Sequence, residues 1–218
     1  QGQIRALPGL NSMNLGNNQL SGDIPEQLGA LTGLVSLTLA GNLLSGSLPP
    51  ELGDLASLKF LDLSSNQLDG AIPARLGDLT PLLFLHLEHN QLNGSIPAEL
   101  GDLVSLRVLW LHDNLLTGDI PPSFANLVNL YNAGLYSGAD GLDLDYNYLH
   151  VPEDYPDLDD PLQALLAQKD PDWHTLQGFT VEVPITGGAF TSLDGRLSVT
   201  IPAGALDQTT LFTFTPLP

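Results

Sequence analysis

The chain has 218 residues and carries 25 acidic side chains against six lysines and arginines, which gives a formal net charge of −19. So acidic a protein lacks the basic surface that neutralises phosphates, which excludes nucleic acid and disfavours anionic membranes as partners. It contains no cysteine, so disulfides and thiolate chemistry are excluded, and no apolar run is long enough for membrane insertion. Because residue 1 is glutamine rather than an initiator methionine, we expect the chain to begin after processing or to be a fragment.

A pattern of 24 residues recurs through more than half of the chain, L-x-x-L-x-L-x-x-N-x-L-x-G-x-I-P-x-x-L-G-x-L-x-x. A fixed period of this length predicts a solenoid of stacked coils, an architecture that usually serves as a binding surface. Its asparagine position is occupied by Asn18, Asn42, Asn66, Asn90 and Asn114, and its proline position by Pro25, Pro49, Pro73, Pro97 and Pro121.

Within each unit, the L-x-x-L-x-L segment is expected to form a short strand. Leu61 and Leu63 alternate with Asp62, so the two leucines face the core and Asp62 faces outward. Strands of successive units should lie about 4.8 Å apart in one parallel sheet. The return path of the coil is expected to be filled by Leu68, Ile72, Leu76 and Leu79.

The asparagine column predicts a set of amides inside the coils. The chain turns just after each strand, where backbone groups have no partner strand. A buried amide can both donate and accept, so it can satisfy these groups. The asparagines expected in this structural role are Asn18, Asn42, Asn66, Asn90, Asn114 and Asn147.

The L-x-G-x-I-P segment resembles the plant-type subclass of leucine-rich repeat proteins over about residues 4–150. The resemblance implies a leucine-rich repeat solenoid with a parallel sheet on the concave face, a second and smaller sheet beside it, and an irregular or 3-10 convex side. Plant members usually cap the solenoid with cysteine pairs, and this chain has none. A bacterial secreted or surface protein is therefore expected rather than a plant receptor.

The regular repeat ends near Leu130, and Leu142 opens the next strand-like segment. The glycine-rich residues between them predict a loop that leaves the solenoid and returns. We therefore assign residues 1–151 to the solenoid, with an insertion at about 131–141.

Residues 152–176 are expected to cap the solenoid. Asp160 followed by Pro161 predicts the first residues of a short helix. An apolar side that would cover the last repeat is formed by Leu162, Leu165 and Leu166. The stretch 165–173 is similar to the segment that closes leucine-rich repeats in some secreted bacterial proteins.

From residue 177, alternation of apolar and polar residues predicts strands at 179–185, 196–201 and 211–215. The stretch 187–206 resembles the opening of a ZU5-like β-domain of secreted bacterial proteins. Such a domain needs more strands than these residues supply, so 177–218 is expected to be a partial β-sandwich-like segment.

Outward-facing strand positions should form columns across the concave face, with small polar residues in the first units and larger ones in the later units. An exposed sheet face does not require large aromatic residues, so we predict a ligand-binding patch there. The alternative is that the insertion or the following β segment buries this surface. The predicted patch comprises Phe60, Phe84, His86, Glu88, Trp110, His112 and Tyr146.

Three histidines on this face, His86, His89 and His112, resemble a metal-ligand set. However, His86 and His89 are three residues apart on a strand, so they should point to opposite faces unless the turn reorients one. Asp54, Asp78 and Asp102 form another column, for which a solvated face is the default expectation. No metal site is predicted from either group.

The segment Asp143-x-Asp145-x-Asn147, together with Asp154, resembles a calcium loop, but the glycine expected in such a loop is replaced by Tyr148. We therefore expect no cofactor, with Ca²⁺ as the alternative.

The sequence contains no nucleophile elbow, P-loop, zinc-protease or dinucleotide motif, so we do not expect an enzyme. We predict an extracellular, non-enzymatic module that recognises a protein or glycan at a bacterial cell surface. The alternative is a subunit of a self-assembling filament or surface layer. Its copies would be joined head to tail through the uncapped first repeat and the unfinished C-terminal segment.

Overall fold

The computed structural model describes residues 9–132, 141–150, 157 and 159–171, and the backbone of four strands between residues 179 and 214. Structural statements below concern these residues. The centre of the predicted insertion, Asp154 of the calcium-like loop and residues 172–178, before the first C-terminal strand, lie outside them.

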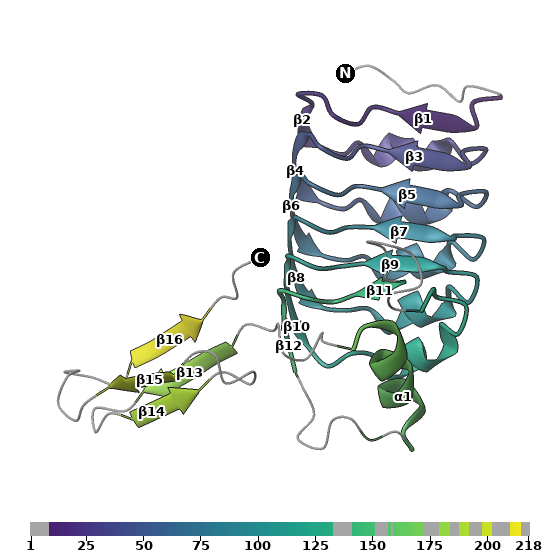
Figure 1. The fold of residues 1–218 in the computed structure, drawn as a ribbon. Helices are drawn as coiled ribbons and strands as arrows, with labels where there is room; N and C mark the ends of the chain where they lie inside the picture. The colour runs from purple at the N-terminus through teal and green to yellow at the C-terminus, as the bar shows by residue number, and fades with distance from the viewer. Residues whose placement is uncertain are drawn as a thin grey trace.

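The described repeats stack as coils, and each coil contributes a strand to each of two parallel sheets (Figure 1). The prediction of a leucine-rich repeat solenoid is therefore confirmed. In sheet 1, which corresponds to the sheet expected on the concave face, equivalent positions of successive units pair in register, so that Phe60 lies beside Phe84 and His86 beside Trp110. Its strands, in spatial order, are β1 (Ser12–Asn14), β3 (Ser36–Thr38), β5 (Phe60–Asp62), β7 (Phe84–His86), β9 (Val108–Trp110) and β11 (Leu142–Asp143).

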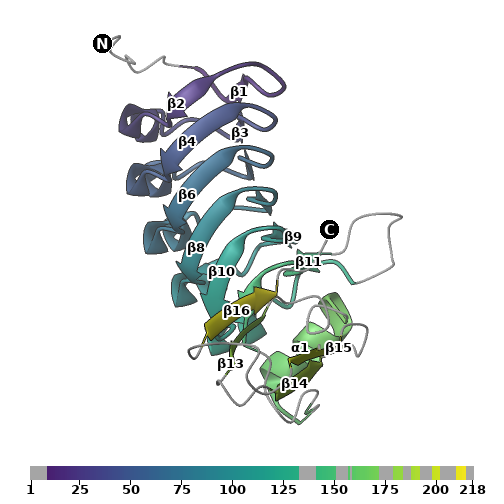
Figure 2. The same ribbon diagram turned by 90° about the vertical axis from the view of Figure 1, so that its left-hand side faces the viewer.

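Sheet 2 is formed by the L-x-G-x-I-P segments (Figure 2). The expectation that it would be the smaller sheet is wrong, because its central strands have five residues against three in sheet 1. The central strands of sheet 2 continue through the repeat glycine, which has a positive φ (72° at Gly70), whereas the asparagine turn ends each strand of sheet 1 early. The strands of sheet 2 are β2 (Ser21–Asp23), β4 (Leu43–Ser47), β6 (Gln67–Ala71), β8 (Gln91–Ser95), β10 (Leu115–Gly118) and β12 (Tyr148–Leu149).

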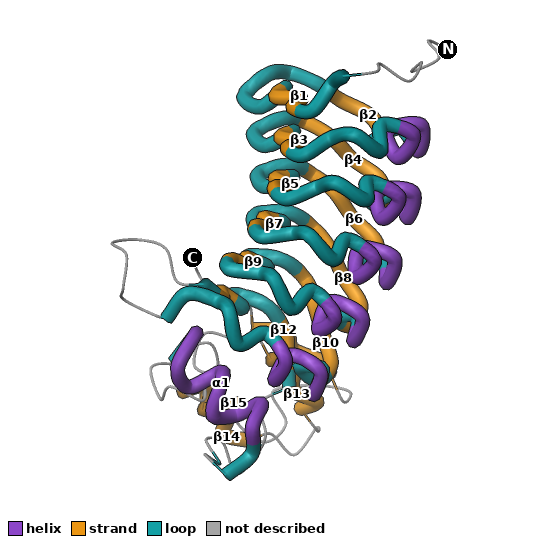
Figure 3. The backbone as a smooth tube through the Cα atoms, turned by 90° about the vertical axis from the view of Figure 1, so that its right-hand side faces the viewer, coloured by secondary structure: helices purple, strands orange, loops and turns teal. Residues whose placement is uncertain are grey.

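A 3-10 turn follows the repeat proline in each of five coils (Figure 3). The proline is extended and its carbonyl accepts the first hydrogen bond of the turn, as from Leu28 N to Pro25 O at 3.0 Å. Successive turns pack closely, since a Cβ added to Gly53 would lie 2.2 Å from the carbonyl oxygen of Arg75. The turns are η1 (Glu26–Ala30), η2 (Pro50–Asp54), η3 (Ala74–Asp78), η4 (Ala98–Asp102) and η5 (Pro122–Asn126).

The core is one continuous cluster of aliphatic side chains that runs the length of the solenoid. In the third unit, Leu61, Leu63, Leu68, Leu76 and Leu79 are all fully buried. Each buried leucine contributes roughly 1.5–3 kcal/mol to folding, so every coil adds to the stability of the stack. Asp62, between two of these leucines, faces outward and is half-buried.

The asparagine amides join neighbouring coils as well as closing their own turn. Asn114 Oδ1 accepts from Leu92 N of the preceding coil at 3.0 Å. Its Nδ2 donates to Leu111 O of its own coil and to Leu87 O of the preceding one, at 3.0 and 3.1 Å. The same contacts to the preceding coil are made by Asn42, Asn66, Asn90 and Asn147.

Burial of the asparagines is less uniform than expected. Asn42, Asn114 and Asn147 are buried, whereas Asn66 and Asn90 are half-buried. The expectation of a buried amide is wrong for Asn18, which is exposed and donates only to Leu15 O and Gly16 O of its own coil. The described residues place no coil before it, so its amide has no earlier backbone to join.

The last coil is covered by α1 (Pro161–Lys169), which begins where Asp160-Pro161 predicts it. Asp160 Oδ1 accepts from the backbone N–H groups of Leu162 and Gln163, at 2.8 and 3.0 Å. Leu165 and Leu166 belong to the solenoid core, and Leu162 packs against it.

Two charged residues at the end of α1 replace contacts that another coil would make. In the regular coils, a backbone N–H after each strand of sheet 1 donates to a carbonyl of the next strand, as from Leu111 N to Asp143 O at 2.9 Å. Leu144 N donates instead to Asp170 Oδ2 at 2.7 Å. Lys169 is buried and donates to Leu130 O at 2.6 Å.

The C-terminal strands form two antiparallel pairs. β13 (Phe179–Val183) pairs with β16 (Thr210–Phe214), and β14 (Gly188–Thr191) pairs with β15 (Ser198–Ile201). β13 and β15 lie within predicted segments, β16 begins one residue before its predicted segment, and β14 is an addition. These pairings do not test the resemblance to a ZU5-like domain, which stays a prediction.

We expect Asn114→Ala to lower the free energy of unfolding by at least about 2 kcal/mol, because it leaves Leu92 N and two buried carbonyls without their partner. Chemical denaturation followed by circular dichroism measures this loss. Asn18→Ala is the matched control, since its amide bonds only within its own exposed turn, and it should cost less than about 1 kcal/mol. Equal losses for both variants would contradict the bridging role.

A second prediction concerns the cap. Asp170→Ala removes the acceptor of Leu144 N and should destabilise the last coil by about 1–3 kcal/mol. Asp170→Asn keeps an oxygen in place and should retain most of the stability. Hydrogen exchange at the amide of Leu144 reports the effect directly: it should accelerate in the alanine variant and stay slow in the asparagine variant.

Candidate functional site

A continuous row of rings crosses the outward face of sheet 1, because in-register pairing repeats the same position from strand to strand. We call it the aromatic ladder, and it consists of Phe60, Phe84, His86, Trp110 and His112. Ring centroids are 5.8 Å apart for Phe60 and Phe84, and 5.5 Å for Phe60 and His86. His86 stacks on Trp110 at 4.4 Å, and Trp110 meets His112 edge-on at 6.2 Å. All five residues are half-buried, so the ladder retains a solvent-facing side.

A third histidine joins this face because the turn redirects it. His89 has a left-handed backbone (φ 55°), and its ring meets that of His112 at 5.0 Å. The turn thus reorients His89, so His86 and His89 lie on the same face and not on opposite faces. His89 Nδ1 lies 2.7 Å from Asp113 Oδ2, which engages this histidine with a carboxylate.

Glu88 is the most deeply buried carboxylate of this face, with 7% of its surface exposed. Leu87, which precedes it, points into the core and is fully buried, so His86 and Glu88 flank it on the outer side. Burial raises the pKa of Glu88, and the charge of Asp62 adds to this, while its own backbone N–H, His112 and His89 act in the opposite direction. Burial also lowers the pKa of His86, assisted by His112 and opposed by Asp62.

His112 differs from His86 because it lies against a carboxylate. Its Nδ1 is 3.0 Å from Asp143 Oδ2, although the contact is not aligned as a full hydrogen bond. Burial by itself lowers the pKa of His112, but the contact with Asp143 and the charges of Asp143, Glu88 and Asp145 outweigh it, so the pKa is raised. The two histidines whose rings contact Trp110 therefore have pKa values shifted in opposite directions.

Tyr146 lies at the edge of the predicted patch rather than within the aromatic ladder. It is half-buried and occupies the left-handed turn position of its coil (φ 52°), as His89 does. The ring contacts among the described residues connect the five ladder members and do not extend to Tyr146. Val108, the in-register neighbour of Phe84 on the next strand, is buried.

The calcium-like loop is rearranged relative to expectation. The Asn147 amide is committed to backbone groups, accepting from Leu116 N and donating to Leu111 O, so it is not free to ligate an ion. Asp143 and Asp145 come together with Asp170, with carboxylate oxygens within 4.8 Å of one another. This is the one cluster with metal-ligand spacing in the described part of the chain, and the three histidines do not form another.

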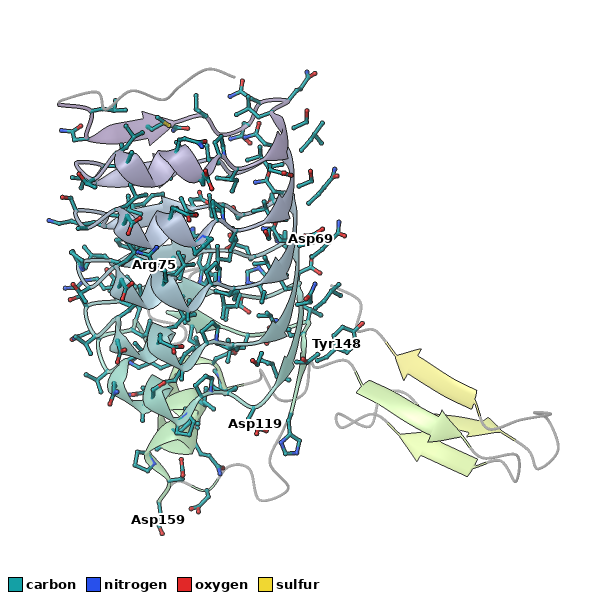
Figure 4. The ribbon with its side chains drawn as sticks, turned by 180° about the vertical axis from the view of Figure 1, so that it is seen from behind. Asp69, Arg75, Asp119, Tyr148 and Asp159 are labelled. Carbon is teal, nitrogen blue, oxygen red and sulfur yellow. The ribbon has the colours of Figure 1, made fainter. Side chains whose placement is uncertain are left out.

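The acidic column on the 3-10 side is exposed to solvent, as expected, and part of its charge is neutralised by a side chain. Arg75 forms an ion pair with Asp54 of the preceding turn, and its Nε lies 3.8 Å from Asp78 Oδ2. Figure 4 shows Arg75 over the 3-10 turns, on the side of the solenoid opposite to sheet 1. All three groups are exposed, so this network contributes little to stability.

The family profile of the Leucine Rich Repeat matches five segments of the chain, residues 9–31, 33–55, 57–79, 81–103 and 105–127. These segments cover more than half of the sequence, and the chain belongs to the leucine-rich repeat proteins. Members of this fold class typically act as protein-interaction modules. No curated protein sequence matches the chain significantly.

Solved structures of similar fold include two receptor kinase ectodomains from Arabidopsis. The first, GASSHO1/SCHENGEN3 in complex with CASPARIAN STRIP INTEGRITY FACTOR 2, is 37% identical, with a TM-score of 0.59 over 64% of this chain and 16% of the receptor. HAESA, in complex with the peptide hormone IDA and the co-receptor SERK1, is 38% identical, with a TM-score of 0.58 over 65% of this chain and 22% of the receptor.

A bacterial protein is similar as well. A leucine-rich repeat protein of Leptospira interrogans is 33% identical, with a TM-score of 0.53 over 65% of this chain and 33% of the bacterial protein. The chain thus spans only a minor part of each of these three relatives. Among the described residues, no helix is long and apolar enough to cross a bilayer.

Three residues of this face fall outside the set that the sequence predicts. Asp62 and Asp143 act on the ladder histidines through their charge, and His89 contacts His112. The signal that could have identified the two aspartates was already in the repeat, because they share a column with His86 and Trp110. The turn conformation of His89 has no such signal.

NMR titration of the imidazole resonances checks the electrostatics of the ladder. His112 should titrate above the ordinary value near 6.5, and His86 below it. A raised folded-state pKa of His112 means that its protonation stabilises the fold. This stabilisation is fully present below the unfolded-state pKa and disappears as the pH rises through the folded-state pKa. Asp143→Asn should therefore cost more stability at acid than at alkaline pH.

Asp143→Asn should also lower the pKa of His112 while His86 keeps titrating below its ordinary value. Asp102→Asn, in the exposed turn η4, is the control and should move neither histidine. An unchanged His112 titration in Asp143→Asn would contradict the assignment.

Proposed function

We propose that the chain is an extracellular, non-enzymatic recognition module that binds a protein partner across the aromatic ladder of sheet 1. The observation that carries this proposal is the unbroken row of half-buried rings on the outer face of sheet 1. Rings in this position add nothing that the repeat requires, since the first two units place Ser12, Asn14, Ser36 and Thr38 at the same positions. Aromatic clusters with a polar rim are typical of protein-binding surfaces.

The comparisons support the same kind of partner. HAESA and GASSHO1/SCHENGEN3 are ectodomains solved with a peptide hormone and with an integrity factor, respectively. A short extended segment suits the geometry here, because the ladder follows the stacking direction across three consecutive strands of sheet 1, β5, β7 and β9. A glycan, which also stacks on aromatic rings, is the alternative ligand, and a bacterial cell surface remains the proposed location.

Self-assembly into a filament is the second candidate that the sequence suggests. Two observations support it. Among the described strands, β1 and β2 each pair on one side only, and Leu15 and Leu20 nearby are exposed. Electron microscopy of the purified chain tests it, since monodisperse particles at high concentration would contradict assembly.

Trp110→Ala and Phe84→Ala should each weaken binding at least tenfold, because each removes ring surface from the centre of the aromatic ladder. The measurement is selection of a random linear dodecapeptide phage library on the wild-type chain, followed by titration of the enriched peptides against each variant. Val128→Ala, an exposed apolar residue after η5 with 68% of its surface accessible, is the matched control and should change nothing.

Unfolding midpoints of both ladder variants should stay near that of the wild-type chain, which separates loss of contact from loss of fold. Retained affinity in Trp110→Ala would place the binding surface elsewhere. A glycan array on the same proteins decides the alternative: binding to a sugar but to no peptide would replace the protein partner by a glycan.

A further inference from the structure

Glu88 occupies a position at which the repeat has no need of an acid. Equivalent positions in the other coils hold Gly16, Ala40, Ser64, His112 and Asp145, and all of these coils stack in the same register. The fold therefore does not require the carboxylate at this position.

One carboxylate oxygen of Glu88 is also left without a hydrogen bond. Glu88 is more than nine-tenths buried, and its Oε2 atom is inaccessible and has no hydrogen-bond partner among the described residues. His86 Nε2, two residues earlier on the same outer side, is likewise an inaccessible atom without a hydrogen-bond partner among the described residues. An unsatisfied buried carboxylate is costly, and a donor group supplied from outside would remove that cost.

Neighbouring side chains do not supply this donor. Ser64 directs its hydroxyl to Asp62 Oδ1 at 2.7 Å, and His89 is engaged with Asp113. His112, whose charge Glu88 senses, is held 3.0 Å from Asp143. The group missing from this corner of the face is thus a hydrogen-bond donor.

The charge of the surrounding face favours a donor group that is positively charged. The outward positions from the strands through the following turns hold Asp62, Asp113, Asp143 and Asp145 besides Glu88, and neither lysine nor arginine. The nearest basic residues in the sequence, Lys59 and Arg107, precede the strands β5 and β9, at the outer edge of the face. An anionic ligand would be repelled here, whereas a cation would be attracted.

We propose that the partner presents a basic side chain, and that Glu88, assisted by Asp62, receives its charged group beside the His86–Trp110 stack. This inference rests on the proposed function and names the chemistry of its partner, a protein segment with an exposed arginine or lysine. Arginine fits better, because its planar guanidinium can donate to a carboxylate while its flat face lies against a ring.

The test uses two synthetic peptides, N-acetyl-Gly-Arg-Gly-Arg-Gly-amide and the same peptide with citrulline in place of both arginines. Citrulline keeps the shape and most donors of arginine but has no charge. Binding is followed through the indole N–H resonance of Trp110 and the imidazole resonances of His86 and His112. We expect the arginine peptide to shift them saturably, and the citrulline peptide to bind at least tenfold more weakly.

Glu88→Gln should weaken the arginine peptide about tenfold or more, since it removes the charge but keeps the size of the side chain. Asp102→Asn, which removes one acid from the other side of the solenoid, is the matched control and should bind like the wild-type chain. Equal affinity for both peptides, unchanged affinity in Glu88→Gln, or no saturable shift would each overturn the proposal. The comparison of peptides on the wild-type chain stands even if the variant fails to fold.

The two proposals fail in different ways. If peptides selected from the phage library lose affinity in Trp110→Ala but not in Glu88→Gln, the recognition surface stands and the cation subsite is overturned. If they keep their affinity in Trp110→Ala, the recognition surface itself is overturned.

Discussion

Each bridging asparagine amide joins two coils with four hydrogen bonds, and the rest of the architecture depends on this contact. The oxygen accepts from the coil before it, and the nitrogen donates both to that coil and to its own turn. Leucine burial drives the coils together, but burial has no direction and would tolerate a sliding contact. The amide is directional, because its donors and acceptor meet the right backbone groups at one offset only.

That fixed offset creates the functional face. Since every coil repeats the same register, a side chain at one outward position lies beside the equivalent side chain of the next unit. Five rings from three consecutive units thereby become one ladder, which would be impossible if neighbouring coils slipped by one residue. The rigid repeat supplies the spacing, and the variable positions supply the chemistry.

The ends of the stack show what the repeat cannot do for itself. A coil has hydrogen-bonding groups on both sides, so the last one needs a substitute for its missing neighbour. Asp170 and Lys169 provide one from a helix, by placing a carboxylate and an ammonium group against the open backbone. The same Asp170 brings a third carboxylate to Asp143 and Asp145, so the cap also shapes the acidic end of the ladder face.

The sequence by itself determined the solenoid, the 24-residue register and the identity of the outward columns, because a strict period places the leucines in the core and the asparagine amide at the turn of each coil. Phe60, Phe84, His86, Trp110 and His112 could thus be predicted as a group. Only the tertiary structure decided that His89 turns onto the same face, that Tyr146 lies apart from the ladder, and that Asp170 replaces Asn147 in the acidic cluster. These depend on turn conformation and on a contact between distant parts of the chain, neither of which the repeat pattern encodes.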